Sequence, residues 1–153
     1  MILLVCGPPG AGKTTVATRA AERLAAAGAP FEVLHSDDFS RRTYERLYDR
    51  VVERPDADWL LDGTFYHREW EERFLQLPNA RLVHVTASLQ TCLERNCARE
   101  NGIDERGVYV VHAEFDEPGA DADLTLDIDE LDADEAADAL VDAVRRWRSD
   151  GDG

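Results

Sequence analysis

Short apolar runs alternate with helical patterns along nearly the whole chain. The first, Ile2–Cys6, is a continuous apolar run, as expected for a strand buried on both faces. The sequence predicts five strands: Ile2–Cys6, Phe31–Ser36, Trp59–Asp62, Arg81–Thr86 and Leu124–Ile128. Between them, apolar residues recur at three- and four-residue spacing, which predicts helices. The first predicted helix is Lys13–Ala27, the second carries Tyr44 and Val51, the third Trp70 and Leu77, and the fourth Leu89 and Leu93. A fifth is predicted at residues 104–115. The last helix has a buried face made of Ala137, Leu140, Val141, Val144 and Trp147.

Strands that alternate with helices indicate βαβ units, and therefore a parallel sheet with right-handed crossovers in an α/β domain. Asp132 and Glu135 have the spacing of a capping box at the start of the last helix. Because there is no internal repeat or linker, residues 1–148 are predicted to form one domain, and residues 149–153 a frayed tail.

The chain has 32 acidic and 17 basic residues, a formal charge of −15. Such a charge ordinarily disfavours nucleic acids and anionic membranes as partners. Abundant Asp and Ala with a single lysine also resemble the composition of salt-accumulating halophiles, whose surfaces are acidic whatever the partner, so RNA is only weakly disfavoured. Three cysteines without a C-x-x-C pair indicate reduced thiols, and no apolar run is long enough to span a bilayer. We therefore expect a cytoplasmic protein without a membrane partner.

The single lysine, Lys13, lies between the first predicted strand and the first predicted helix. Its surroundings fit the P-loop pattern G-x-x-x-x-G-K-[ST], whose backbone N–H groups wrap a polyphosphate. Lys13 would contact the β- and γ-phosphates, the Thr14 hydroxyl would ligate Mg²⁺, and Thr15 would donate to the α-phosphate. The ATP-binding residues expected here are Gly7, Pro8, Pro9, Gly10, Ala11, Gly12, Lys13, Thr14 and Thr15.

Asp62 ends an apolar strand and is followed by Gly63. A carboxylate at the carboxyl end of a parallel strand lies where α/β sheets bind ligands, so Asp62 is the candidate for holding Mg²⁺ with Thr14. A strand-terminating Asp-Gly turn is the alternative. The four histidines lack metal-ligand spacing and are interpreted as structural or surface residues, without a zinc site; they are His35, His67, His84 and His112.

Asp37 and Asp38 end the second predicted strand in the same way. One of them could accept a proton from an acceptor hydroxyl, and one is expected to cap a helix beginning near Ser40. Arg68, with Tyr66 beside it, could bind an anionic acceptor; a surface arginine and a core tyrosine are the alternative.

Arg95 and Arg99 lie four residues apart on one face of a predicted helix. Guanidinium groups at these positions would clamp the transferring phosphoryl group or stack on the base. Both are therefore candidate ATP-binding residues, and Arg95 is also a candidate catalytic residue. The alternative is a salt bridge to the nearby Glu94 or Glu100.

Together these segments resemble the small P-loop kinases grouped around O-phosphoseryl-tRNA(Sec) kinase and, more loosely, adenylylsulfate kinase. The segments are the P-loop, His35–Asp37, Asp62–Arg68, Arg95–Arg99 and Glu114–Pro118. The resemblance implies a three-layer P-loop NTPase fold, with a parallel five-stranded sheet in the order 2-3-1-4-5 and helices on both faces. It also implies that Asp37 is the general base, that residues of about 95–118 form a lid over ATP, and that the segment Asp62–Arg68 faces the acceptor.

The sequence thus predicts a kinase that uses ATP and Mg²⁺ and transfers the γ-phosphoryl group to a hydroxyl of a small molecule. A tRNA or polynucleotide is the alternative acceptor, although the related tRNA kinases carry a further C-terminal domain that grips tRNA. An ATP-binding switch or assembly factor in translation or tRNA modification is a second alternative, and a non-catalytic acidic interaction protein a third. The acceptor, the preference between ATP and GTP, and the oligomeric state stay open.

Overall fold

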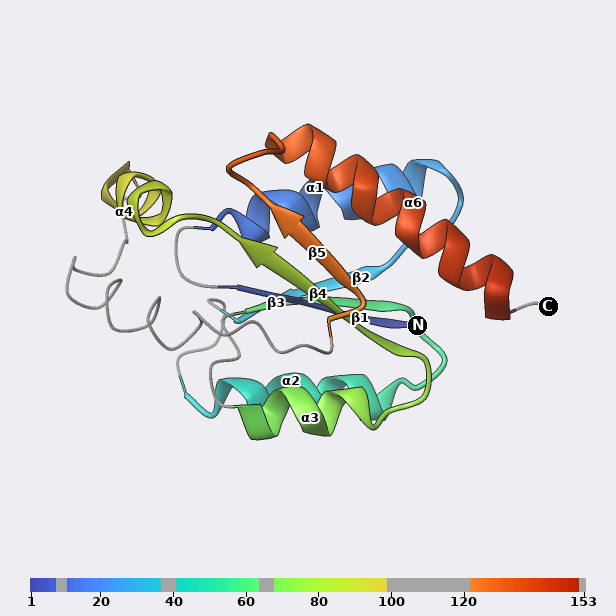
Figure 1. Ribbon diagram of the computed structural model, residues 1–153. Helices are drawn as coiled ribbons and strands as arrows, with labels where there is room; N and C mark the ends of the chain where they lie inside the picture. Colours follow the sequence, from blue (N-terminus) through green and yellow to red (C-terminus); the bar gives the residue numbers. More distant parts are fainter. Residues whose placement is uncertain (8–10, 37–40, 64–67, 99–121, 152–153) are drawn as a thin grey trace.

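Five parallel strands form a single sheet in the order β2-β3-β1-β4-β5 (Figure 1). The computed structural model describes residues 1–7, 11–36, 41–63, 68–98 and 122–151. The strands are β1 (Ile2–Cys6), β2 (Glu32–His35), β3 (Trp59–Gly63), β4 (Ala80–Thr86) and β5 (Leu124–Asp127). The predicted fold class and strand order are confirmed.

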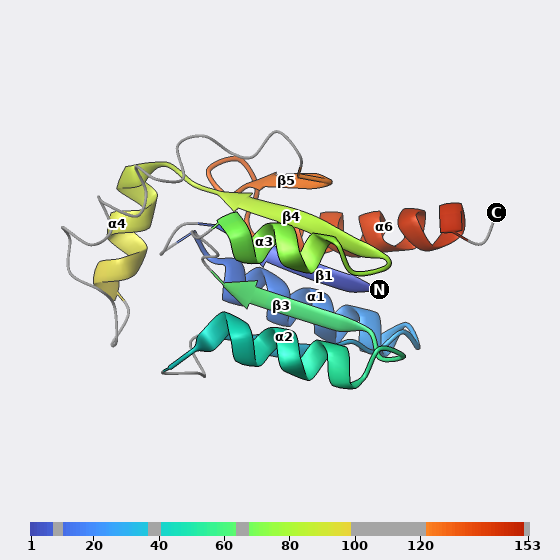
Figure 2. The ribbon, with the colours of Figure 1, turned by 90° about the horizontal axis from the view of Figure 1, so that it is seen from below.

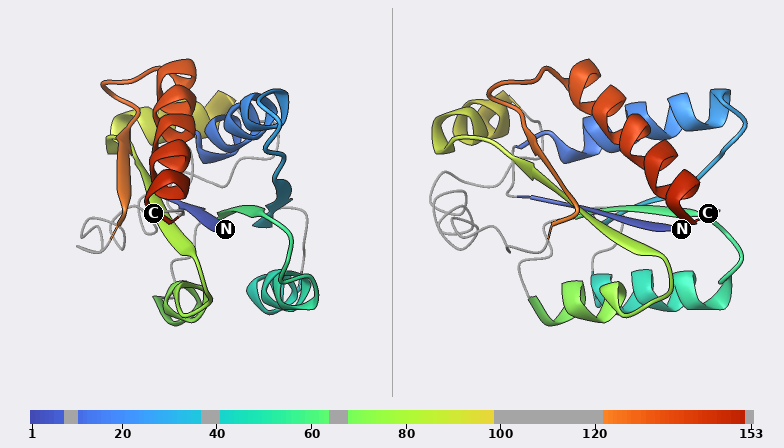
Figure 3. Two further views of the ribbon diagram at one scale, coloured as in Figure 1. Left: turned by 90° about the vertical axis from the view of Figure 1, so that its right-hand side faces the viewer. Right: turned by 45° about the vertical axis from the view of Figure 1, so that its right-hand side comes forward.

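Helices cover both faces of this sheet. The described helices are α1 (Lys13–Ala26), α2 (Thr43–Glu53), α3 (Arg68–Leu75), α4 (Leu89–Ala98) and α6 (Ala133–Gly151). Helices α1 and α6 lie on one face and α2 and α3 on the other, which gives the three layers visible end-on in Figure 3. Among the described residues, no helix is both long enough and apolar enough to cross a membrane.

Alternating side chains of the central strand enter two separate apolar cores. Leu3 and Val5 belong to the core under α1 and α6, whereas Ile2, Leu4 and Cys6 belong to the core under α2 and α3. This period of two is why the strand sequence is apolar at every position. Figure 2 views the sheet from the side of α2 and α3, and these two helices lie in front of the strands there.

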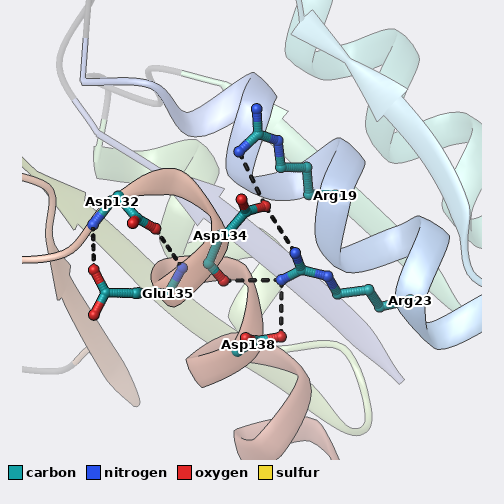
Figure 4. A network of polar contacts seen from close by, with 6 residues as sticks. All are labelled: Arg19, Arg23, Asp132, Asp134, Glu135 and Asp138. Carbon is teal, nitrogen blue, oxygen red and sulfur yellow. Dashed lines mark hydrogen bonds and ion pairs between the residues drawn. The ribbon is translucent and has the colours of Figure 1, made fainter.

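The first turn of α6 carries the predicted capping box. The Glu135 N–H donates to Asp132 Oδ1 at 2.8 Å, and the Asp132 N–H donates to Glu135 Oε1 at 3.2 Å (Figure 4). Two backbone donors at the helix start are thereby satisfied. The prediction from the sequence spacing is confirmed.

An ion-pair network joins α6 to α1, the helix that follows the P-loop. Arg23 contacts both Asp134 and Asp138 at 2.8 Å, and Arg19 contacts Asp134 at 3.1 Å (Figure 4). Exposed pairs of this kind each contribute about 1 kcal/mol or less, so the buried apolar face between the two helices dominates. The ion pairs join specific residues of α1 and α6 and so favour one alignment of the two helices.

Helix α2 begins later than predicted. Its N-cap residue is Arg42, which has φ 51° and forms no side-chain cap. The prediction that Asp37 or Asp38 caps a helix near Ser40 is therefore wrong. The apolar positions that α2 buries, Leu47 and Val51, do not require a helix before Thr43.

Helix α6 ends later than predicted, since it continues through Gly151 into the segment that was expected to fray. Its last turns are attached to the domain through Arg148. The Arg148 guanidinium donates to Asp58 Oδ2 at 2.8 Å and lies 5.1 Å from the centre of the Phe31 ring. These contacts hold the helix end against the start of β3.

Candidate functional site

The P-loop segment connects β1 to α1 at the edge of the sheet where the strands end. Gly12 is the N-cap residue of α1 and has φ 87°, a left-handed conformation that L side chains rarely adopt. Lys13, Thr14 and Thr15 then form the first helical turn, whose N–H groups point out of the helix start. The predicted ATP-binding residues Pro8, Pro9 and Gly10 lie outside the described residues.

Gly7 has a packing role that the P-loop pattern does not reveal. A Cβ at this position would lie 2.3 Å from the backbone oxygen of Val85 in the neighbouring strand β4. The loop can therefore leave the sheet this close to β4 only because residue 7 has no side chain. Ala11, on the helix side of the loop, is fully buried.

We expect Gly7→Ala to lower the free energy of unfolding by about 1–3 kcal/mol, because a backbone oxygen cannot move aside as a flexible side chain would. Urea unfolding measures the effect, which should appear as a lower midpoint with an unchanged slope. An unchanged midpoint would show that β1 and β4 separate without cost, contrary to the close approach seen here.

Asp62 is the buried carboxylate of the site. It is 2% exposed and lies near the end of β3. Along β3, Leu60 enters the core beneath α1, so the alternation places Asp62 on the same face, beside the start of α1. The Thr14 hydroxyl donates to Asp62 Oδ1 at 3.1 Å. The structure thus brings together the two residues that the sequence assigned to the metal.

Burial raises the pKa of Asp62 above its ordinary value. His35, the Thr14 hydroxyl and the Lys13 ammonium oppose this shift but do not cancel it. The negative charge of the ionised Asp62 carboxylate is therefore only partly balanced by the protein groups around it. A cation bound close to this carboxylate would be stabilised. This is the chemistry that a hard divalent metal ion offers.

The Thr14 hydroxyl and the Asp62 carboxylate are oxygen donors, the kind that Mg²⁺ prefers. Among the residues that the structure describes, no group of three or more His, Cys, Asp or Glu side chains could hold a metal ion. Mg²⁺ usually keeps several waters and takes one or two protein oxygens together with substrate phosphates. The Thr14 hydroxyl and the Asp62 carboxylate, next to the P-loop, satisfy that requirement.

His35 was interpreted from the sequence as a structural or surface residue, and the structure adds a contact that this interpretation did not include. His35 is the last residue of β2 and pairs in register with Asp62 of β3. The Nδ1 atom of His35 contacts Asp62 Oδ2. Metal-ligand spacing could not reveal it, because the contact joins strands 27 residues apart in sequence. The available signal was strand order: if β2 neighbours β3, their terminal polar residues meet.

The remaining predicted residues lie at the same edge or outside the described part. Arg68 begins α3 and Arg95 lies in α4, beyond the carboxyl edge of the sheet in Figure 1, but their side chains are not among those described. Asp37, Asp38, Tyr66, Arg99 and most of the predicted lid lie outside the described residues. Their roles stay predictions.

Cys6, directly before the P-loop, is a buried thiol. Its pKa lies well above the ordinary value, first because of burial and second because of the nearby Glu71 carboxylate. The thiol is therefore protonated and part of the apolar floor beneath the site.

The family of this chain is shown by a match to most of its sequence. Residues 2–118, well over half of the chain, match the family model described as an AAA domain. The chain belongs to this family. The matched region includes the P-loop, β2, Asp62 and α4, and so contains every site residue named above.

Solved structures with the same fold include several kinases. A sugar kinase from Janibacter sp. HTCC2649 has 15% identity and a TM-score of 0.72, with 97% of this chain and 94% of that chain covered. A gluconokinase from Sinorhizobium meliloti 1021 has 14% identity and a TM-score of 0.73, covering 96% and 93%. The APS kinase of Mycobacterium tuberculosis, in complex with AMPPNP and APS, has 19% identity and a TM-score of 0.69, covering 94% of each. At such low identity these likenesses show the P-loop NTPase fold.

Proposed function

We propose that this AAA domain is a kinase that transfers the γ-phosphoryl group of ATP to a hydroxyl group of a small molecule. The observation that carries the proposal is the hydrogen bond from Thr14 to the buried Asp62, 3.1 Å long, at the start of the P-loop helix. It joins the two motifs that position nucleotide and metal in P-loop enzymes. The similar structures named above are kinases of small molecules, which favours a small acceptor.

Thr14 and Asp62 would hold Mg²⁺ together with the phosphates. When bound, Mg²⁺ neutralises charge on the phosphates and polarises the group to be transferred. The Thr14 hydroxyl can keep donating its proton to Asp62 Oδ1 while an oxygen lone pair faces the cation. Asp62 in turn would accept hydrogen bonds from water molecules around the cation.

Lys13 would draw charge from the β- and γ-phosphates, and Arg95 and Arg99 would approach the nucleotide from the other side. Asp37 would take the proton of the acceptor hydroxyl as its oxygen bonds to the γ-phosphorus. The bond from that phosphorus to the β,γ-bridging oxygen breaks, and ADP leaves with the electron pair.

Asp38, Tyr66 and Arg68 are the proposed acceptor-binding residues. A closed lid would exclude water, which would otherwise accept the phosphoryl group in place of the alcohol.

ATP labelled in the γ-phosphate tests this function directly. We would incubate it with Mg²⁺ and the protein at high potassium chloride, with sugars and sugar acids, with APS, and separately with total tRNA. Label on a small alcohol is the expected result. Label on tRNA would favour the polynucleotide alternative, release of inorganic phosphate alone would favour an ATP-dependent switch, and no consumption of ATP would overturn the proposal.

A further inference from the structure

The buried Asp62 carboxylate is fixed by donors from two separate elements. Its Oδ1 accepts from the Thr14 hydroxyl of α1 at 3.1 Å, and its Oδ2 lies against Nδ1 of His35 at the end of β2. An ionised carboxylate can only accept hydrogen bonds, so the imidazole nitrogen that faces it carries the hydrogen and donates. Both oxygens are therefore directed by the protein.

His35 is the more exposed member of this pair. Its side chain is 27% exposed, whereas that of Asp62 is 2% exposed. Along β2, Val33 packs against the core beneath α1 and Leu34 against the opposite core, so His35 returns to the α1 face. The imidazole consequently sits on the face of the sheet where Thr14 and Asp62 meet.

We propose that His35 is a positioning residue of the magnesium site: it holds the Asp62 carboxylate in the orientation that the cation requires, without ligating the cation. This inference rests on the proposed function, because it assumes that Asp62 and Thr14 hold Mg²⁺ with a nucleotide. Without the His35 donor, the Asp62 carboxylate can turn about its terminal bond. Outer partners that fix a metal-binding carboxylate typically change metal affinity by about 10–100-fold.

Variants of residue 35 separate a donor from a space-filling role. His35→Leu removes the donor, whereas His35→Asn keeps a nitrogen at the place of Nδ1. His35→Gln keeps an amide but moves it one bond farther out, and it remains informative if the leucine variant folds poorly. Glu32→Gln is the matched control, since Glu32 lies on the same strand but pairs with Arg54 at 2.5 Å, away from the site.

The measurement is the thermal stabilisation of each variant by ADP, titrated with Mg²⁺ and compared with ADP in the presence of a chelator. We expect His35→Leu and His35→Gln to need roughly 10–100-fold more Mg²⁺ for half of the full stabilisation. His35→Asn and Glu32→Gln should match the wild type. Stabilisation by ADP without Mg²⁺ should be the same in every variant.

Three results would overturn the inference alone, in a wild type that Mg-ADP does stabilise. One is an unchanged Mg²⁺ midpoint in His35→Leu and His35→Gln. Another is a His35→Asn midpoint as high as that of His35→Leu, since the donor would then be irrelevant. The third is an equal loss of stabilisation by ADP without Mg²⁺, which would show a role in the loop rather than in the metal site. A wild type that Mg-ADP does not stabilise would instead overturn the proposed function, and this inference with it.

Discussion

Replacing Lys13 by alanine is expected to lower phosphoryl transfer by about 10²–10³-fold or more, the cost of removing a preorganised group that stabilises developing charge. The Lys13 charge opposes the rise in the pKa of both Asp62 and Cys6, so it acts at the candidate site. The variant should still fold, since Lys13 belongs to neither apolar core.

Arg19→Ala is the matched control for this prediction. It removes one positive charge from the same helix, but Arg19 pairs with Asp134 on the side of α6. Transfer of labelled phosphate from ATP, together with circular dichroism, compares the two variants. Equal activity of Lys13→Ala and wild type would end the proposed mechanism, and an equal loss in Arg19→Ala would show that general charge matters rather than the P-loop position.

The central strands β1 and β3 could be predicted closely because they are buried on both faces. β1 begins and ends where its apolar run does, at Ile2 and Cys6, and β3 exceeds the predicted Trp59–Asp62 only by Gly63. A continuous apolar run has no other stable place than a sheet covered on both sides. Helix ends were less predictable. The end of α6 is held by the contact of Arg148 with Asp58, 90 residues away in the chain, which no local pattern contains.

The candidate site was predictable where a local motif describes it. Gly12, Lys13 and Thr14 follow from the P-loop spacing, and Asp62 from its position at a strand end. The contact of His35 with Asp62 was missed because it depends on the register in which β2 and β3 pair, which strand order alone does not give. The packing of Gly7 against Val85 was missed for the same reason, since it depends on how closely the end of β1 approaches β4.

Asp62→Asn is expected to separate activity from stability. Turnover should fall by about 10²-fold or more, because the neutral amide cannot balance a divalent cation. The free energy of unfolding should stay equal or rise, because the pKa of Asp62 is raised by burial and the ionised form is disfavoured in the fold. The amide oxygen can still accept from Thr14, and the amide nitrogen can donate to His35 Nδ1 when that imidazole carries its hydrogen on Nε2.

The sign of the pH dependence follows from the raised pKa of Asp62. The folded protein binds this proton more tightly than the unfolded chain, whose carboxyl titrates near 3.8, so wild-type stability falls as pH rises from about 4 through the folded pKa. The asparagine variant lacks this loss. Urea unfolding at about pH 4 and at about pH 7 should therefore show its relative stability increasing with pH; a variant that loses stability at neutral pH would contradict the expectation.

Asp58→Asn, at the other end of the same strand, is the control with the opposite outcome. The Asp58 carboxylate pairs with the Met1 amino group at 2.7 Å and with the Arg148 guanidinium at 2.8 Å. The Asp58 side chain is partly exposed. Its neutral variant should lose stability, by about 1 kcal/mol or less for each pair, and keep full turnover. On the proposed function, the carboxylate before β3 serves the fold and the one near the strand's end serves the metal site. If both variants lost activity in parallel with stability, Asp62 would be a structural residue and the metal site would have to be sought elsewhere.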